Sequence, residues 1–407
     1  MYKARIKNNI CTNAHPVGCF YNVHRQMQEA VSEKMSGLEN KTALVIGCSS
    51  GIGLASRTAL TFAAGMDTLG VYFDRAAQAH KYGTAGWYQN QALEYYARRS
   101  GKMALSTNQD AFQANAKDWV IQKLQQQDKK IDVLVYSLAS PKRKIKGLDE
   151  YRSTIKPIGE TFQGRTLDVF KGELRNLEIE PATPDEVEAT VKVMGGEDWQ
   201  EWVLYLKKAG VLADNFKTVA YSYLGPENTQ EIYGKGTLGR AKAHLHETAL
   251  ALGPVLKDIN GQACIGLLQA LVTPSSSVIP SMPLYLSILH QEQRLQNKYE
   301  STLQQVLRLF NNKWFEGQLL NSLQGSSHYL RVDDLERSDT IQESVAKIFA
   351  QLKQDNLTEL VNIDQFKIEF LQQFGFSYDF INYEKKPDPL TPPALHDFDS
   401  IELAVAG

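Results

Sequence analysis

The sequence is poor in cysteine, in net charge and in long apolar runs. Its four cysteines are scattered over 407 residues, too few for a disulfide framework, so we expect reduced thiols. The 44 basic and 46 acidic residues nearly cancel, which argues against nucleic acid or an anionic membrane as partner. No apolar run reaches the length of a membrane span, and the first residues lack the apolar core of a signal peptide. We therefore expect a cytoplasmic protein without stable membrane association.

Three potential metal ligands lie close together near the start of the chain. Cys11, His15 and Cys19 form a C-x3-H-x3-C pattern. A fourth ligand is not evident nearby, and Pro16 and Gly18 are typical of a turn. We expect no metal here and interpret these cysteines as structural.

A glycine-rich segment, GCSSGIG at 47–53, follows the apolar run 42–46 and precedes an Ala- and Leu-rich stretch at 53–62. This order predicts a buried strand, a tight turn and a helix whose free N–H groups can bind phosphate. A second predicted strand, 68–73, ends at Asp74, which is placed to accept hydrogen bonds from ribose hydroxyls. The segment therefore indicates a dinucleotide site; a helix-capping glycine cluster followed by a solvated aspartate is the alternative.

Further predicted strands complete an α/β pattern. They lie at 103–105, 131–136 and 218–224, and 271–273 is interpreted as another strand end. We predict a Rossmann-type doubly wound parallel sheet, with ligands beyond the carboxyl ends of its strands.

Two regions extend this core. The region of roughly 142–217 is predicted to be an inserted helical part that covers the substrate, although helix packing is the commoner reason for the aromatic spacing at 199–205. A C-terminal layer is predicted from about 330, with a helix at 343–353 and Phe374-Gly-Phe376. The whole chain, 1–407, is expected to form a single domain.

Tyr233 and Lys242 are the candidate catalytic pair. Nine residues apart on one helix they would face opposite ways. The glycines between them favour a tyrosine on an irregular loop, a helix capped by Thr237, and a lysine in its first turns. Alone, such a pair is more often a loop tyrosine and a solvated lysine. With the glycine turn upstream it predicts a nicotinamide-dependent reductase, because tyrosine can donate a proton and lysine can adjust its pKa.

Taken together, these segments resemble the trans-2-enoyl-CoA reductase family, which includes FabV-type enoyl-[acyl-carrier-protein] reductases. Generic short-chain dehydrogenases space the tyrosine and lysine as Y-x3-K, whereas this chain has Y-x8-K. The resemblance covers almost the whole chain and rests on segments 11–19, 44–54, 67–74, 135–141, 193–199, 220–227, 233–242 and 374–376.

The resemblance implies residue roles. Tyr233 would be the proton donor, Lys242 would assist it and bind the cofactor, and Tyr223 would contact the substrate. The chain departs from the family pattern at Ile52, Asp74 and Pro274, where the family has tyrosine, glutamate and glutamine. Arg75 leaves the cofactor phosphate preference open. The implied NADH site comprises Gly47, Cys48, Ser49, Ser50, Gly51, Ile52, Phe73, Asp74, Asp110, Ala111, Leu138, Ala139, Lys242, Leu271, Val272 and Thr273.

The implied reaction is the NADH-dependent reduction of the C2–C3 double bond of a trans-2-enoyl thioester, the final step of fatty-acid elongation. The acyl carrier would be acyl carrier protein or coenzyme A; the residues do not distinguish them. A short-chain-type carbonyl reductase and a non-catalytic NAD-binding sensor are the alternatives. No flavin is expected, and the chain is expected to be a monomer or a weak homodimer.

Overall fold

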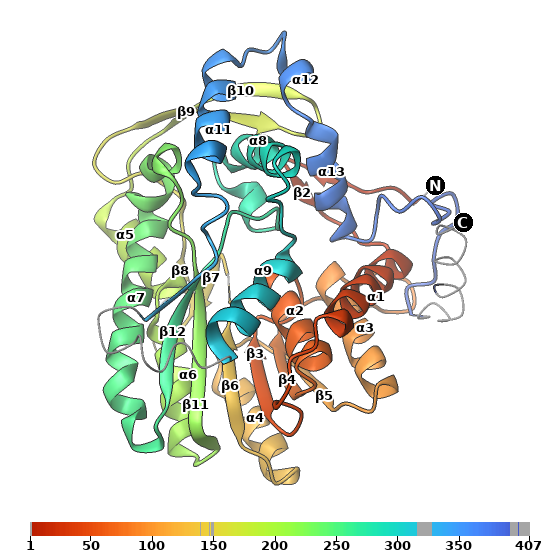
Figure 1. Ribbon diagram of the computed structural model, residues 1–407, viewed down its shortest axis with the longest axis vertical. Coiled ribbons are helices and arrows are strands. Elements are labelled where there is room, and N and C mark those ends of the chain that lie inside the picture. The colour runs from red at the N-terminus through yellow and green to blue at the C-terminus, as the bar shows by residue number, and fades with distance from the viewer. Residues whose placement is uncertain are drawn as a thin grey trace.

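A seven-stranded parallel sheet forms the centre of the protein (Figure 1). The computed structural model describes residues 2–138, 140–145, 147, 150–315, 328–390 and 398. The strand order is β13-β12-β11-β6-β3-β4-β5, so the chain reverses direction across the sheet between β3 and β6. This arrangement confirms the predicted doubly wound fold. The strands are β3 (Thr42–Ile46), β4 (Asp67–Tyr72), β5 (Ala104–Asn108), β6 (Ile131–Tyr136), β11 (Leu212–Ser222), β12 (Gln262–Leu267) and β13 (Tyr329–Arg331).

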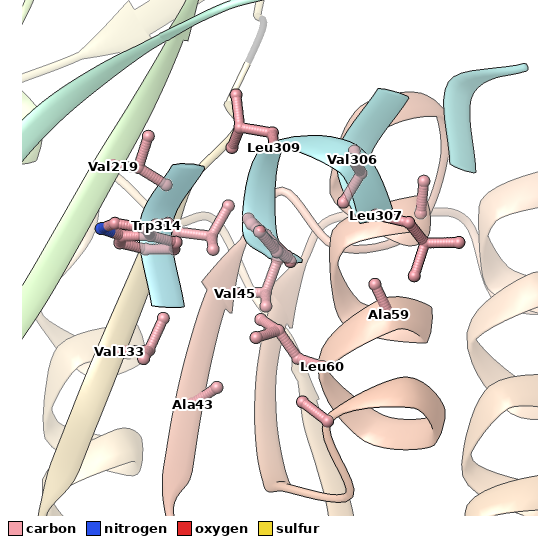
Figure 2. Packing of buried hydrophobic residues seen from close by; sticks show 14 of the residues in the cluster. Ala43, Val45, Ala59, Leu60, Val133, Val219, Val306, Leu307, Leu309 and Trp314 are labelled. Carbon is pink, nitrogen blue, oxygen red and sulfur yellow. The ribbon is translucent and has the colours of Figure 1, made fainter. Parts of the chain in front are cut away.

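The central strand β3 is buried on both faces. Ala43 and Val45 belong to one hydrophobic cluster, and Leu44 and Ile46 belong to the other. Such alternation follows from the two-residue period of a strand, and a strand covered on both sides must be apolar throughout. Figure 2 shows the first cluster, in which Trp314 and neighbouring side chains pack over the sheet.

Helices cover both faces of the sheet. On the face of Figure 2 lie α2 (Gly51–Thr58), α3 (Ala85–Arg99), α1 (Pro16–Ser32) and α9 (Thr302–Leu309). On the other face lie α4 (Ala114–Gln126), α6 (Glu197–Lys208) and α7 (Thr237–Leu256). The helix predicted at 53–62 is divided, because a π-helical turn, Ala59–Ala63, follows α2.

The region of roughly 142–217 contains strands as well as helices. Two antiparallel hairpins, β7–β8 (Lys142–Lys144, Glu150–Arg152) and β9–β10 (Phe162–Asp168, Glu173–Ile179), precede α5 (Pro184–Met194) and α6. The hairpin strands have exposed polar faces, which obscured them in the sequence. The aromatic residues of α6 pack into the core: Trp199 Nε1 donates to Thr218 Oγ1 at 2.9 Å, and Trp202 Nε1 to the Ala111 carbonyl at 3.1 Å. Helix packing thus explains their spacing.

A second layer caps one end of the sheet. Helix α8 (Met282–Leu295) packs with α11 (Asp339–Gln351), α13 (Ile363–Gln372) and the β9–β10 hairpin, and short α12 (Leu357–Leu360) lies beside them (Figure 1). The C-terminal helix predicted at 343–353 corresponds to α11, which begins four residues earlier, at Asp339. The interpretation of 271–273 as a strand end is wrong, because β12 ends at Leu267 and these residues lie in the loop that follows.

The first helix packs against the C-terminal turn. Short strands β1 (Ile6–Lys7) and β2 (Ile10–Cys11) lead to His15, whose backbone N–H donates to the Phe374 carbonyl at 2.9 Å. A Cβ atom on Gly18 would lie 2.0 Å from the Gly375 carbonyl oxygen, so only glycine fits there. The Cys-His-Cys segment and the Phe-Gly-Phe segment therefore form one packing contact.

The four cysteines are buried free thiols. Among the residues that the structure describes, no cluster of three histidine, cysteine or acidic side chains is arranged to hold a metal ion. None of the described helices has both the length and the apolar composition needed to span a membrane.

Candidate active site

The glycine-rich turn lies at the point where the sheet order reverses, between the carboxyl ends of β3 and β6. Gly47 has a left-handed backbone (φ +80°), and its N–H donates to the Val71 carbonyl at 2.8 Å. A Cβ atom on Gly47 would lie 2.4 Å from the Ser137 carbonyl oxygen, and one on Gly53 would lie 1.9 Å from the Gly47 oxygen. Both positions therefore require glycine. The first N–H groups of α2 have no acceptor within their helix and can bind an anion.

A cavity of about 1000 Å³ opens beyond this turn. Its volume is at the upper end of the range for ligand sites, as a dinucleotide would need. The predicted cofactor residues that line it are Gly47, Ser49, Ser50, Gly51, Ile52, Phe73, Asp74, Asp110, Ala111, Leu138 and Thr273.

The other predicted cofactor residues lie elsewhere. Cys48 belongs to the turn but is fully buried in the core, and Val272 is buried against the layer that contains α8. Lys242 and Leu271 line a second cavity. Ala139 lies outside the described residues.

Asp74 is held in a defined position at the end of β4. Its carboxylate Oδ1 accepts a hydrogen bond from Thr84 Oγ1 at 2.6 Å, and its backbone N–H donates to Asn108 Oδ1 at 2.8 Å. A Cβ atom on Gly86 would lie 2.5 Å from Asp74 Oδ2, so this glycine allows the start of α3 to approach the carboxylate. Thr84, Asn108 and Gly86 could not be identified from the sequence, because they lie at the start of α3 and the end of β5 and belong to no motif.

The second cavity, of about 190 Å³, adjoins the first. The two share Ile52, Ser137, Leu138, Thr273 and Ser275. The structure thus brings Tyr223, Tyr233 and Lys242 together beside the larger cavity. Apolar side chains form much of the remaining wall, among them Met194, Leu238, Leu268, Ile279 and Met282.

A break in helical structure allows Tyr233 and Lys242 to share one cavity. Tyr233 lies in a π-helical turn, Gln230–Gly234, rather than in an irregular loop. The cap residue of α7 is Gly236 instead of Thr237, which is the first helical residue and donates from Oγ1 to the Thr154 carbonyl at 2.6 Å. Lys242 lies in the second turn of α7. Both side chains line the same cavity.

The Lys242 ammonium and the Tyr233 hydroxyl are in different environments. Lys242 Nζ donates to the Tyr221 carbonyl at 2.8 Å, and burial lowers the pKa of Lys242 to about 8. Burial raises the pKa of Tyr233, so its phenol is protonated at neutral pH. Among the described residues, nothing forms a hydrogen bond with the Tyr233 hydroxyl. Tyr233 therefore has a proton to offer, and Lys242 is a cation that can lose its own proton near pH 8.

Tyr223 differs from Tyr233 in having a strong hydrogen-bond acceptor. Its hydroxyl donates to Glu336 Oε1 at 2.7 Å, and its ring meets that of Tyr233 edge to face with centroids 5.1 Å apart. Glu336 follows β13 and is fully buried. The sequence gives no sign of this burial, because a glutamate in the charged run 331–337 is typical of a solvated surface.

This geometry defines a class of protein. A doubly wound sheet has a glycine turn and a dinucleotide-sized cavity at its reversal point, and a tyrosine and a lysine line the adjoining cavity. Such a protein is a nicotinamide-dependent oxidoreductase.

Comparison with known proteins identifies the family. Residues 1–79 match the model for the NAD(P)H binding domain of trans-2-enoyl-CoA reductase, and residues 81–315 match that for the trans-2-enoyl-CoA reductase catalytic region. Residues 325–386 match the enoyl reductase FAD binding domain. The chain belongs to the trans-2-enoyl-CoA reductase family.

Relatives match over nearly their full length. The enoyl-[acyl-carrier-protein] reductase [NADH] of Shewanella baltica is 40% identical, covering 98% of this chain and 99% of that protein. The trans-2-enoyl-CoA reductase [NADH] of Clostridium perfringens is 41% identical, covering 95% and 98%. Crystal structures of trans-2-enoyl-CoA reductases from Clostridium acetobutulicum with NADH and Treponema denticola with NAD are 36% and 37% identical. Both have a TM-score of 0.89, and they cover 96% and 95% of this chain and 98% of their own.

The segment matched to a flavin-binding model lies apart from the two cavities described above. Within its described part, 328–386, no residue lines either of the two cavities. Its helices instead bury apolar side chains against α8 and the β9–β10 hairpin.

Proposed function

We propose that the protein uses NADH to reduce the C2–C3 double bond of trans-2-enoyl thioesters, giving saturated acyl thioesters in the final step of fatty-acid elongation. The observation that carries this proposal is the shared wall between the large cavity and the cavity of Tyr233 and Lys242. The names of the relatives support the substrate class and include both carriers, acyl carrier protein and coenzyme A.

The residues of the large cavity suit NADH. The free N–H groups at the start of α2 would bind its pyrophosphate, and the Asp74 carboxylate would accept hydrogen bonds from a ribose. Phe73, whose side chain is 76% exposed at the rim, could cover the adenine ring. Asp110, Ala111 and Leu138 would complete the pocket.

The reaction requires stabilisation of negative charge and delivery of a proton. NADH, when bound, supplies the hydride that adds to C3. The electron pair of the double bond then moves toward the thioester carbonyl, whose oxygen becomes an enolate. Stabilising that charge is usually a large part of catalysis. Tyr233 lines this cavity and its hydroxyl is free to donate. Its proton would complete the saturated product at C2, and the phenolate would then regain a proton from solvent.

Lys242 would adjust the acidity of Tyr233. Burial alone makes Tyr233 a weak acid, whereas a nearby positive charge favours its phenolate. The Tyr221 carbonyl fixes the ammonium at 2.8 Å. The same charge would also hold the nicotinamide ribose, so that Lys242 would serve both the cofactor and the proton donor.

We further propose that residues 1–407 act as one enoyl reductase domain, because the candidate site draws on residues from Gly47 to Glu336. A cytoplasmic location and a monomer or weak homodimer remain our predictions. Analytical ultracentrifugation would test the oligomeric state.

The decisive experiment follows NADH oxidation by the purified protein with crotonyl-CoA. We expect turnover, and none with acetoacetyl-CoA. Turnover of acetoacetyl-CoA alone would favour a carbonyl reductase, and turnover of neither, nor of crotonyl-acyl carrier protein, would favour a sensor. Matched CoA and carrier-protein thioesters of several chain lengths then identify the preferred substrate.

A further inference from the structure

Glu336 is a fully buried carboxylate beside the candidate site. Its Oε1 accepts hydrogen bonds from the hydroxyls of Tyr223 and Tyr285, both at 2.7 Å, and its Oε2 accepts one from the Ala270 N–H at 2.6 Å. In the described part of the chain, no lysine or arginine forms an ion pair with it. A buried carboxylate is costly unless hydrogen bonds satisfy it, so these three donors define its position.

Glu336 does not line the cavity itself but contacts residues that do. Tyr223 and Ala270 line the cavity that contains Tyr233, whereas Glu336 and Tyr285 do not. Tyr285 lies on α8, so the carboxylate joins the C-terminal layer, the loop after β12 and the end of β11. Two of the three hydrogen bonds, those from Tyr223 and the Ala270 N–H, come from residues of the cavity wall.

The hydrogen bond to Glu336 determines what Tyr223 can do. A phenol has a single proton to donate, and a bond to a carboxylate is about twice as strong as one to a neutral carbonyl. While Tyr223 donates to Glu336, it cannot donate to a thioester oxygen. Its ring, set edge to face against Tyr233, can still contact the acyl chain.

We infer that Glu336 is a positioning residue of the enoyl site. Its hydrogen bond fixes the ring of Tyr223 in the cavity wall and occupies the Tyr223 hydroxyl, so that Tyr233 is the phenol that donates to the substrate. This inference rests on the proposed function. It also gives the segment after β13, which belongs to the region matched to a flavin-binding model, a role in substrate binding.

A double-mutant cycle on Tyr223 and Glu336 tests this role. Tyr223→Phe removes the hydrogen bond, and Glu336→Gln replaces its charged acceptor with a neutral amide. Both substitutions keep the side-chain shape. Each should raise KM for crotonyl-CoA by roughly 10-fold, the size of one charge-assisted hydrogen bond. Saturating turnover should stay within about threefold, because Tyr233 is untouched. The double variant should have the same KM as either single variant.

Tyr285→Phe is the matched control. It removes a hydrogen bond of the same length from the same oxygen, but Tyr285 does not line the cavity, so KM should change by less than about threefold. The dissociation constant for NADH, measured by fluorescence, should be the same in all variants and reports that they fold.

Three results would overturn the inference: a parental KM in Glu336→Gln, fully additive increases in the double variant, or an equal increase in Tyr285→Phe. Loss of NADH binding in Glu336→Gln would assign the residue to folding alone. A parent protein without crotonyl-thioester turnover would refute the proposed function, and this role with it.

Discussion

The rings of Tyr223 and Tyr233 meet edge to face with their centroids 5.1 Å apart, yet their hydroxyls differ in hydrogen bonding. Tyr223 donates to Glu336, whereas the Tyr233 hydroxyl has no acceptor among the described residues. Two similar side chains in one cavity are therefore chemically distinct, and only one is free to act as an acid.

Tyr233→Phe should abolish most of the activity. The substitution keeps the ring and removes the hydroxyl that we assign to proton delivery. The loss of a general acid costs roughly 100- to 10,000-fold in turnover, about 3–5 kcal/mol. Binding of NADH should persist, because the glycine turn and Lys242 remain. Saturating turnover within a few-fold of the parent would refute the assignment and favour Tyr223 or a bound water as the acid.

Lys242→Ala should damage turnover at least as much as cofactor affinity, because the charge serves both the chemical step and the ribose. Stopped-flow measurement of the chemical step and a fluorescence titration with NADH separate the two effects. A change confined to the dissociation constant would contradict the pKa role of Lys242.

Activity should fall at alkaline pH, because the charge of Lys242 is then lost. Because burial lowers the pKa of Lys242 to about 8, the side chain is charged below that pH and neutral above it. The value of kcat/KM for NADH should therefore decrease about tenfold per pH unit above roughly 8. Burial raises the pKa of Tyr233, so this residue does not cause the decrease. In Lys242→Arg the charge persists, and the decrease should disappear even if the rate is lower; an unchanged profile would argue against Lys242.

NADH should be strongly preferred over NADPH, because the Asp74 carboxylate would repel a 2′-phosphate. Asp74→Ser should raise the ratio of NADPH to NADH efficiency by at least about tenfold, the effect of one like-charge interaction near the surface. Arg75→Gln in the same background should reverse the gain if Arg75 binds the phosphate. Equal efficiencies in the parent protein would contradict this role of Asp74.

Gly53→Ala should severely weaken NADH binding, because its Cβ atom would lie 1.9 Å from the Gly47 carbonyl oxygen. The matched control is Gly253→Ala on α7, where nothing lies within 4 Å of the new Cβ atom. There alanine should raise the free energy of unfolding by up to about 1 kcal/mol, through helix propensity alone. Calorimetric melting and NADH titration of both variants check these expectations. Normal NADH affinity in Gly53→Ala would show that the turn can relax.

The sequence predicted features that depend on local patterns. The strand 42–46, the glycine turn and the strand 131–136 follow from continuous apolar runs and adjacent glycines, and the structure has both strands with the predicted bounds. The β9–β10 hairpin could not be found in this way, because its half-exposed strands lack a clear apolar period. Glu336 could not be found either. Its partners Tyr223 and Tyr285 are 113 and 51 residues away, and tertiary packing alone makes this glutamate a buried group.

The contact between Gly18 and Gly375 has a consequence for how the protein matures during synthesis. The glycine turn and β3 to β6 have left the ribosome long before residue 375 is made. Helix α1 cannot complete its packing until the C-terminal turn arrives, since His15 and Gly18 contact residues 374 and 375. Glu336 is also translated late. A nascent chain therefore contains its nucleotide-binding turn well before it contains the carboxylate that anchors Tyr223, so that cofactor binding can precede assembly of the acyl site.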